Sequence, residues 1–97
     1  FNSIVDFDKE LSVMAGISGL TRGELKGVRE EILKVAGGSV KTSNDVAKLS
    51  TTLFSLGKSK EEVKLLLTPV NDLSIALGST AEETANLLGG FRFSGNN

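Results

Sequence analysis

Apolar residues recur at spacings of three and four along most of the chain, which is typical of amphipathic α-helices. The pattern predicts helices over about residues 3–18, 22–36, 44–56 and 60–77, and a fifth helix that begins at Ala81. The positions expected to face inward are Ile4, Phe7, Leu11, Met14, Leu25, Val28, Ile32, Val35, Val46, Leu49, Leu53, Leu56, Val63, Leu66, Val70, Leu73, Leu77, Leu87, Leu88 and Phe91. We therefore expect an all-α fold, a compact bundle of about five short helices.

Helix starts are marked by a hydroxyl residue followed three positions later by glutamate, the capping-box pattern. Three such stretches begin at Thr21, Ser59 and Thr80. In this motif the hydroxyl accepts a hydrogen bond from the third backbone amide, and the acid accepts one from the amide of the cap. A fourth start is expected at Thr42 or Ser43, because Asp45 would then lie in the first turn, where the helix dipole favours an acid.

Helix ends are marked by glycine. Gly19, Gly37–Gly38, Gly57 and Gly78 each follow a periodic apolar stretch, and we expect left-handed C-terminal caps at these points. Pro69 lies inside the fourth predicted helix, where it removes a backbone hydrogen bond. Either the helix kinks there, or Thr68 caps a new helix that begins with the proline.

The starts at Thr21 and Ser59 are 38 residues apart, and a shift of the sequence by 38 residues places caps on caps and most apolar positions on apolar positions. One interpretation is a duplication in which residues 21–57 and 59–95 form two stacked αα-hairpins, with the first helix across them and the fifth continuing to about Ser94. The other is that any two antiparallel hairpins with similar loops would align in this way.

The chain has the length of one domain, so we expect a single helical domain over residues 1–97. Its parts would be an N-terminal helix (1–19), a first hairpin (21–57) and a second hairpin (59–97). Because it starts at Phe1 without an initiator methionine, we expect it to be a fragment of a longer protein.

Composition narrows the classes of function. The 11 basic and 12 acidic residues are scattered, which predicts no nucleic-acid partner for this chain. There is no cysteine and no histidine, and hence no disulfide, thiolate nucleophile, imidazole base or zinc cluster. The longest apolar runs are far shorter than the roughly 20 residues that span a bilayer, so we expect no membrane span and no signal peptide. We predict no enzyme, no catalytic residues, no metal site and no cofactor.

Three features that could suggest chemistry have simpler explanations. The pairs Glu61–Glu62 and Glu82–Glu83 fall in first turns, where acids cap helices. Residues 37–42 contain the glycine, lysine and threonine of a phosphate-binding loop, but the spacing differs and the stretch follows a helix instead of a strand. A small basic patch interleaved with acids is best explained as a solvated face: Lys58, Lys60 and Lys64.

The fourth predicted helix carries apolar residues on two sides. At about 100° per residue, Leu65 and Ile75 fall away from the main apolar stripe. Our first interpretation is a central helix buried on two sides. The alternative is a second apolar surface for another copy or another protein, with Leu65 and Ile75 as the candidate interface residues.

A succession of short segments resembles the conserved core region of phage tail tape measure proteins, in order and spacing along nearly the whole chain. The segments are Phe7–Leu11, Ser18–Thr21 with Glu24–Leu25, Ser43–Ala47, Leu56–Glu62, Pro69–Leu73 and Thr80–Ala85. Two positions depart from the family pattern. Leu56 stands where a small residue usually precedes the glycine, and Gly89–Gly90 stands where helix formers are expected.

The resemblance implies a structural protein of a tailed phage or prophage that takes part in tail assembly and sets tail length. It implies a location in the virion tail lumen, or in the bacterial host cytoplasm during assembly, and protein partners: other copies of itself and tail tube or tail tip components. The family has no catalytic residues to carry over. The alternative function is a general helical protein–protein interaction domain, adaptor or regulatory, that binds through an apolar groove. We also expect a compact body with a radius of gyration near 13 Å, and not an extended rod.

Overall fold

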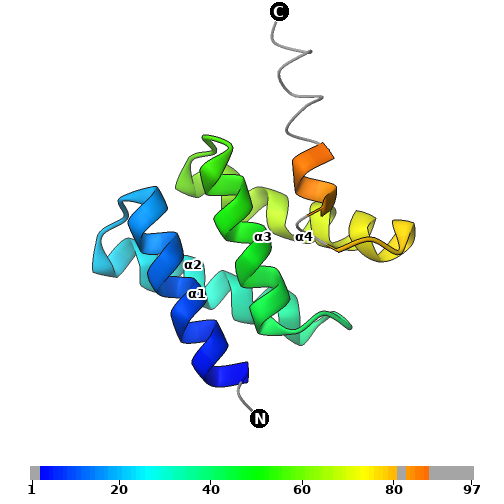
Figure 1. Cartoon of the computed structure of the whole chain (residues 1–97), viewed down its shortest axis with the longest axis horizontal. Coiled ribbons are helices and arrows are strands. Elements are labelled where there is room, and N and C mark those ends of the chain that lie inside the picture. The colour runs from blue at the N-terminus through cyan, green and yellow to red at the C-terminus, as the bar shows by residue number, and fades with distance from the viewer. Residues whose placement is uncertain (1–2, 81–82, 88–97) are drawn as a thin grey trace, which may run out of the picture.

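The computed structural model describes residues 3–80 and 83–87 of the chain, with side chains from Asp6 onward (Figure 1). The helices are α1 (Ser3–Ser18), α2 (Arg22–Gly37), α3 (Ser43–Ser55) and α4 (Lys60–Leu77), and residues 83–87 form a further helical segment. Every regular element in these described ranges is a helix, which confirms the all-α prediction. The predicted end of the fifth helix lies outside the described residues.

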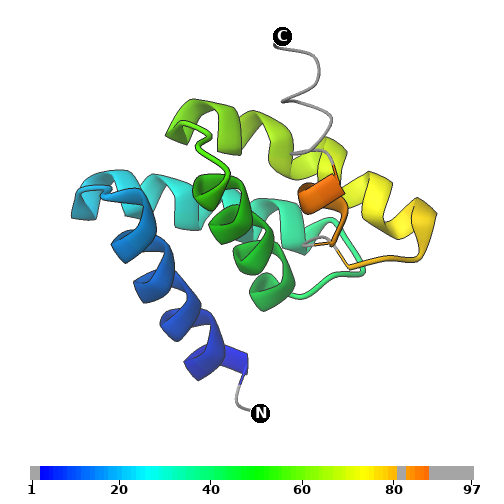
Figure 2. The same cartoon turned by 45° about the horizontal axis from the view of Figure 1, so that its top comes forward.

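The helices pack in two layers that cross each other. In Figures 1 and 2, α1 and α3 lie side by side and run in the same direction; α2 crosses behind both of them, and α4 crosses behind α3. The first helix, which we expected to lie across both hairpins, crosses α2 and lies alongside α3. The Cα radius of gyration is 12.7 Å and the longest dimension is 40 Å, so the prediction of a compact body is confirmed.

α2 and α4 also run in the same direction. Near their starts, Lys60 Nζ lies 3.2 Å from a carboxylate oxygen of Glu24. Farther along, the Asn71 side chain of α4 donates a hydrogen bond to Ser39, just beyond the end of α2. Matching positions of the two helices are thus neighbours in space, and their first residues are 38 positions apart in the sequence.

All the predicted capping boxes are present, and a fourth is built on Thr42 with Asp45. In each, the hydroxyl accepts from the third backbone amide at 3.0 to 3.2 Å, and the acid accepts from the backbone N–H of the cap at 2.8 to 3.1 Å. The residues that cap are Thr21, Thr42, Ser59 and Thr80. These reciprocal bonds satisfy amides that have no partner inside the helix.

Three of the four predicted glycine caps are left-handed. Gly19, Gly57 and Gly78 have φ values of 71°, 89° and 69°. The prediction is wrong at Gly37–Gly38, since Gly37 is still helical and Gly38 has φ −100°. There the helix ends through tightened bonds, from Gly38 N–H to Val35 O and from Ser39 N–H to Ala36 O, which satisfy the last carbonyls without a left-handed residue.

Pro69 lies within one continuous helix, so the alternative of a new helix capped by Thr68 is wrong. A proline at this position leaves the carbonyl of Leu65, four residues earlier, without its helical partner. Leu65 lies on the solvent side of α4, where water can satisfy that carbonyl. The helix therefore tolerates a proline at position 69.

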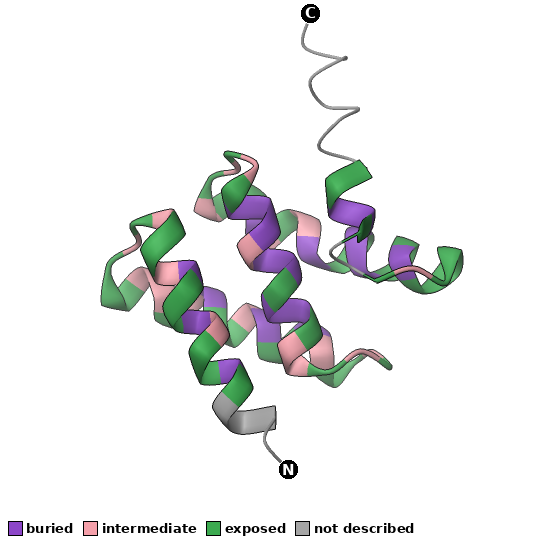
Figure 3. Ribbon diagram, viewed as in Figure 1, coloured by how far each residue is buried: buried purple, intermediate pink, exposed green. Residues whose placement is uncertain are grey.

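The core forms where the two layers meet, as the purple segments of Figure 3 show. Its members come from all four helices and from the segment of residues 83–87: Phe7, Leu11, Met14, Val28, Ile32, Val35, Val46, Ala47, Leu49, Leu53, Phe54, Val63, Leu67, Val70 and Ala85. The inward stripes predicted for the first three helices are confirmed at their buried positions, with Leu25 and Leu56 only partly buried. Ile4, Leu88 and Phe91 lie outside the residues whose side chains are described.

The inward face of α4 differs from the prediction. Leu73 and Leu77 are exposed, whereas Asn71 and Ser74 are buried. At 100° per residue, the centre of the buried arc is turned by about 65° from the centre of the predicted stripe. Hydrogen bonds satisfy part of these buried polar groups: Asn71 Nδ2 donates to Ser39 Oγ at 2.9 Å, and Ser74 Oγ donates to the Asn71 carbonyl at 2.7 Å.

The segment of residues 83–87 shows a similar exchange. Leu87, expected inside, is exposed, whereas Thr84 and Ala85 are buried. The Thr84 hydroxyl lies 2.6 Å from that of Ser79 and donates to the Thr80 carbonyl. A small polar side chain with local hydrogen bonds thus takes the inward position.

Candidate functional site

The two candidate interface residues lie on the outside of α4. Leu65 has 77% of its surface exposed and Ile75 has 40%. The interpretation of a helix buried on two sides is therefore wrong for both. Within the described chain, α2 and α3 cover one side of α4, and Leu65 points about 170° away from the centre of the buried arc.

The structure does not bring Leu65 and Ile75 together. They are ten residues apart, which corresponds to about 15 Å along the helix, and they differ by about 80° around its axis. Leu73 and Leu77, one turn apart, form a second exposed aliphatic pair on the other side of the helix end from Ile75. The exposed aliphatic side chains of α4 thus lie on different sides of the helix and do not form a single groove.

Sequence reasoning missed several other exposed aliphatic residues. Val13 and Ile17 lie one turn apart on α1 and are each about half exposed, and Val40, in the loop after α2, is 84% exposed. Val13 and Ile17 fall outside the stripe of Phe7, Leu11 and Met14, which is a signal that could have identified them. Nothing in the sequence distinguishes Val40 from a loop residue that packs on the core.

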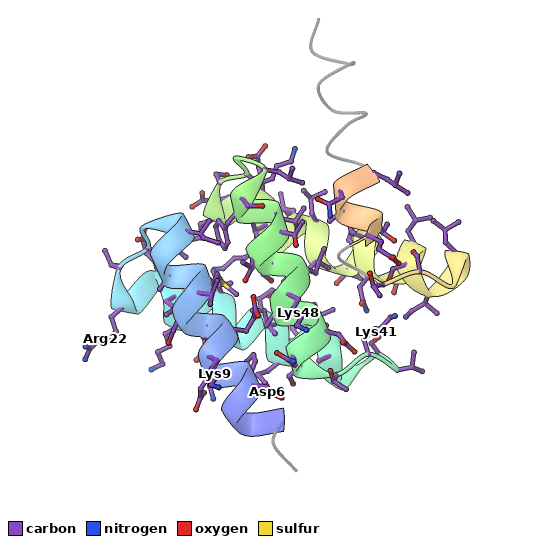
Figure 4. The ribbon with its side chains drawn as sticks, in the orientation of Figure 1. Asp6, Lys9, Arg22, Lys41 and Lys48 are labelled. Carbon is purple, nitrogen blue, oxygen red and sulfur yellow. The ribbon has the colours of Figure 1, made fainter. Side chains whose placement is uncertain are left out.

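Polar side chains gather where α1 meets α3. Figure 4 shows Asp6 and Lys9 on α1 and Lys48 on α3, which line an open hollow together with Glu10 and Asn44. The charges of both signs alternate there. Among the described residues, no three acidic, histidine or cysteine side chains come close enough together to hold a metal ion.

An open hollow of about 320 Å³ lies between α1, α2 and the start of α3. Its lining includes Phe7, Arg29 and Asn44, and the guanidinium carbon of Arg29 lies 5.6 Å from the centre of the Phe7 ring. This is a cation–π distance, and it places the guanidinium of Arg29 over the Phe7 ring. The lining hydroxyls of Thr42 and Ser43 have no imidazole or thiolate beside them, because the chain has none.

The stretch that resembles a phosphate loop has a structural role. Residues 38–42 connect α2 to α3, and Lys41 Nζ donates to the carbonyl of Ser79 at 3.3 Å. In Figure 4 this lysine reaches towards the end of α4. This bond connects the loop between α2 and α3 to the residues that follow α4.

The charged groups that carry shifted pKa values belong to helix caps. The backbone N–H of Thr21, followed by the side chain of Lys60, holds the pKa of Glu24 below its usual value. Glu24 in turn raises the pKa of Lys60, which also lies 3.7 Å from Glu61. The backbone N–H of Thr80 lowers the pKa of Glu83. The causes of these shifts are helix-cap hydrogen bonds and the Glu24–Lys60 ion pair.

Within the described residues, no helix is both long and apolar enough to cross a membrane. Comparison of the chain with protein-family models, with curated proteins and with solved structures gives no match.

Proposed function

We propose that this chain is an assembly module of a phage or prophage tail tape measure protein. It would provide a protein contact during tail assembly, while helical segments elsewhere in the same protein set the length of the tail. The succession of capped segments that resembles the family supports this proposal, together with the shape of the domain.

The observation that supports a contact role for this domain, with length set elsewhere in the protein, is its longest dimension of 40 Å. A ruler works through its length, and a continuous helix of 97 residues would extend about 145 Å at 1.5 Å per residue. The glycine ends at Gly19, Gly57 and Gly78 turn the chain back on itself instead. A compact body of this kind suits an anchoring contact better than measurement.

The experiment is an in-frame deletion of residues 1–97 from the full-length gene in its bacterial host, with particles viewed by electron microscopy. Loss of tails, or tails of uncontrolled length, is the expected result, because an assembly contact is missing. Normal tails shortened by about 145 Å would mean that this stretch measures length as an extended helix. Tails of unchanged number and length would contradict any part in assembly.

The contact surface is proposed to include Leu65, the most exposed residue of the candidate pair. If another copy covers it, Leu65→Glu should convert an oligomer into a monomer without loss of helix content. Thr68→Glu is the matched control, since it places the same charge at an exposed position one turn away. Light scattering measures the oligomeric state of the two variants, and circular dichroism measures their helix content. An equal effect of both variants on the oligomeric state would count against a specific contact at Leu65.

The second candidate is a general helical adaptor or regulatory domain. The parallel stacking of α1 on α3 and of α2 on α4 favours it, because helical-repeat binding proteins stack successive helix pairs in this way. Sequencing the neighbouring genes separates the two. Genes for a tail tube, baseplate or tail chaperone beside this one support the first candidate, and their absence supports the second.

A further inference from the structure

Four apolar residues, each one turn from the next, form a ridge along the exposed surface of α4. This α4 ridge consists of Leu65, Pro69, Leu73 and Leu77, all of which are exposed. Residues at a spacing of four form ridges on a helix surface, and helices pack by placing such ridges into the grooves of a neighbour. Successive members differ by about 40° around the axis, so the ridge winds slowly along the helix. It contains no charged residue and is therefore suited to burial in a contact.

The equivalent positions 38 residues earlier, on α2 and just beyond its end, lie where α2 meets α4. They are Gly27, Glu31, Val35 and Ser39. At one end, Ser39 Oγ accepts a hydrogen bond from Asn71 of α4 at 2.9 Å. At the other end, Lys64 Nζ of α4 lies 3.3 Å from the point where a Cβ atom of Gly27 would be, and the two middle residues line the open hollow between the helices. This side of α2 thus receives the next helix of its layer, whereas the same side of α4 is uncovered in the described chain (Figure 2).

The other end of this helix layer does not match the α4 ridge. The α4 residues that border α2 include Lys60, Lys64 and Asn71. The positions 38 residues before this side of α4 are exposed and mostly charged: Arg22, Lys26, Glu30 and Leu33. A head-to-tail stack of two copies would remove these charges from water against aliphatic side chains, which costs free energy. The terminal units of helical stacks carry polar faces of this kind.

We propose that a second copy of this chain covers the α4 ridge, with the two α4 helices side by side and antiparallel about a two-fold axis. Leu65 of one copy then faces Leu77 of the other, and Pro69 faces Leu73, because both pairs are centred on position 71. The ridge is thus complementary to itself, as a two-fold interface requires. The dipoles of antiparallel neighbours also attract. The inference rests on the Leu65 contact of the proposed function and gives that contact its partner and geometry.

Sedimentation equilibrium on the full chain tests the association. The expected mass at high concentration is twice the chain mass of 10.2 kDa. Leu77→Glu should raise the dissociation constant of the dimer at least about tenfold without loss of helix content, because each copy would bury an unpaired carboxylate. Leu73→Glu should have the same effect. Ile75→Glu is the matched control, since it places the same charge at an exposed aliphatic position between these two but outside the ridge.

Cross-linking tests the antiparallel geometry, and the absence of cysteine from the chain allows single cysteines to be introduced. Leu65→Cys and Leu77→Cys lie about 18 Å apart along the helix. A short bifunctional maleimide should therefore link a mixture of the two variants and should link neither variant alone. Efficient linkage of Leu65→Cys to itself would mean a parallel arrangement and would overturn the two-fold geometry.

Two other results overturn the proposal: a mass of one chain at every concentration, or an equal weakening by Ile75→Glu and Leu77→Glu. These results are distinct from failure of the assembly role. A monomeric chain whose deletion from the gene still abolishes tails would refute the dimer and leave the assembly role in place. A dimer whose deletion leaves tails unchanged would support the interface and refute the role in assembly.

Discussion

Removal of the Thr21 hydroxyl should destabilise the domain by about 1 kcal/mol. The Thr21→Ala change eliminates the acceptor for the backbone N–H of Glu24, a bond of 3.2 Å at the start of α2. The return bond, from Thr21 N–H to the Glu24 carboxylate at 2.9 Å, does not need the hydroxyl and can persist. The loss is therefore that of one capping bond.

The same reasoning gives a magnitude for heat denaturation. For a domain of 60–100 residues, 1 kcal/mol corresponds to a fall of roughly 4–8 °C in Tm. Ser59→Ala and Thr80→Ala remove equivalent bonds, of 3.2 and 3.0 Å, and should show losses of similar size. The three sites therefore form an internally consistent series.

Urea and thermal unfolding, followed by circular dichroism, measure these losses. Thr21→Ser is the control, because it keeps the hydroxyl and should stay within a few tenths of a kcal/mol of the parent. If none of the three alanine variants lost stability, or if Thr21→Ser lost as much as Thr21→Ala, the capping bonds would not be stabilising the helix starts.

Three further predictions concern the core, the backbone and pH. Met14→Ala, at a fully buried position, should cost about 2–5 kcal/mol in urea unfolding, and a loss below 1 kcal/mol would mean that the α1–α3 contact is loose. Gly78→Ala, at φ 69°, should cost about 1–2 kcal/mol, whereas Gly38→Ala, at φ −100°, should be neutral or slightly stabilising; equal effects would contradict the backbone assignment. Because the folded pKa of Glu24 lies below its unfolded value, its contribution to stability is present above the unfolded pKa, near pH 4, and is lost as pH falls through the folded pKa. Unfolding free energies at pH 7, 5 and 3 should therefore fall less steeply for Glu24→Gln than for the parent, and parallel profiles would refute this.

The helices and their starts could be predicted from the sequence because they depend on local rules. A hydroxyl residue followed by an acid three positions later, as at Thr21 or Ser59, forms the reciprocal capping bonds. These bonds do not depend on how the rest of the chain packs. The apolar spacing of three and four in α1 likewise selected Phe7, Leu11 and Met14, which are all buried.

The inward face of α4 could not be predicted, since hydrophobicity alone placed Leu73 and Leu77 inside. Burial of Asn71 depends on a hydrogen bond to Ser39, 32 residues earlier, and no periodic pattern contains such a long-range partner. The exposure of Leu65 and Ile75 also depends on which sides of α4 its neighbours cover. The hollow beside Asn71, between α2 and α4, arises from the same packing, and no local pattern of residues predicts it.

The parallel course of α2 and α4 places like ends of two helix dipoles next to each other, and α1 and α3 do the same in the other layer. Each pair of neighbouring N-termini carries two partial positive charges, whose repulsion an antiparallel pair would avoid. The acids of the first turns stand at these ends: Asp6 in α1, Glu24 in α2, Asp45 in α3, and Glu61 and Glu62 in α4. Beyond capping single helices, these carboxylates provide the negative charge that lets two parallel helices begin side by side. Dissolved salt then acts in opposite directions on this arrangement, because it screens the repulsion between the helix ends as well as the attraction of the acids that offset it.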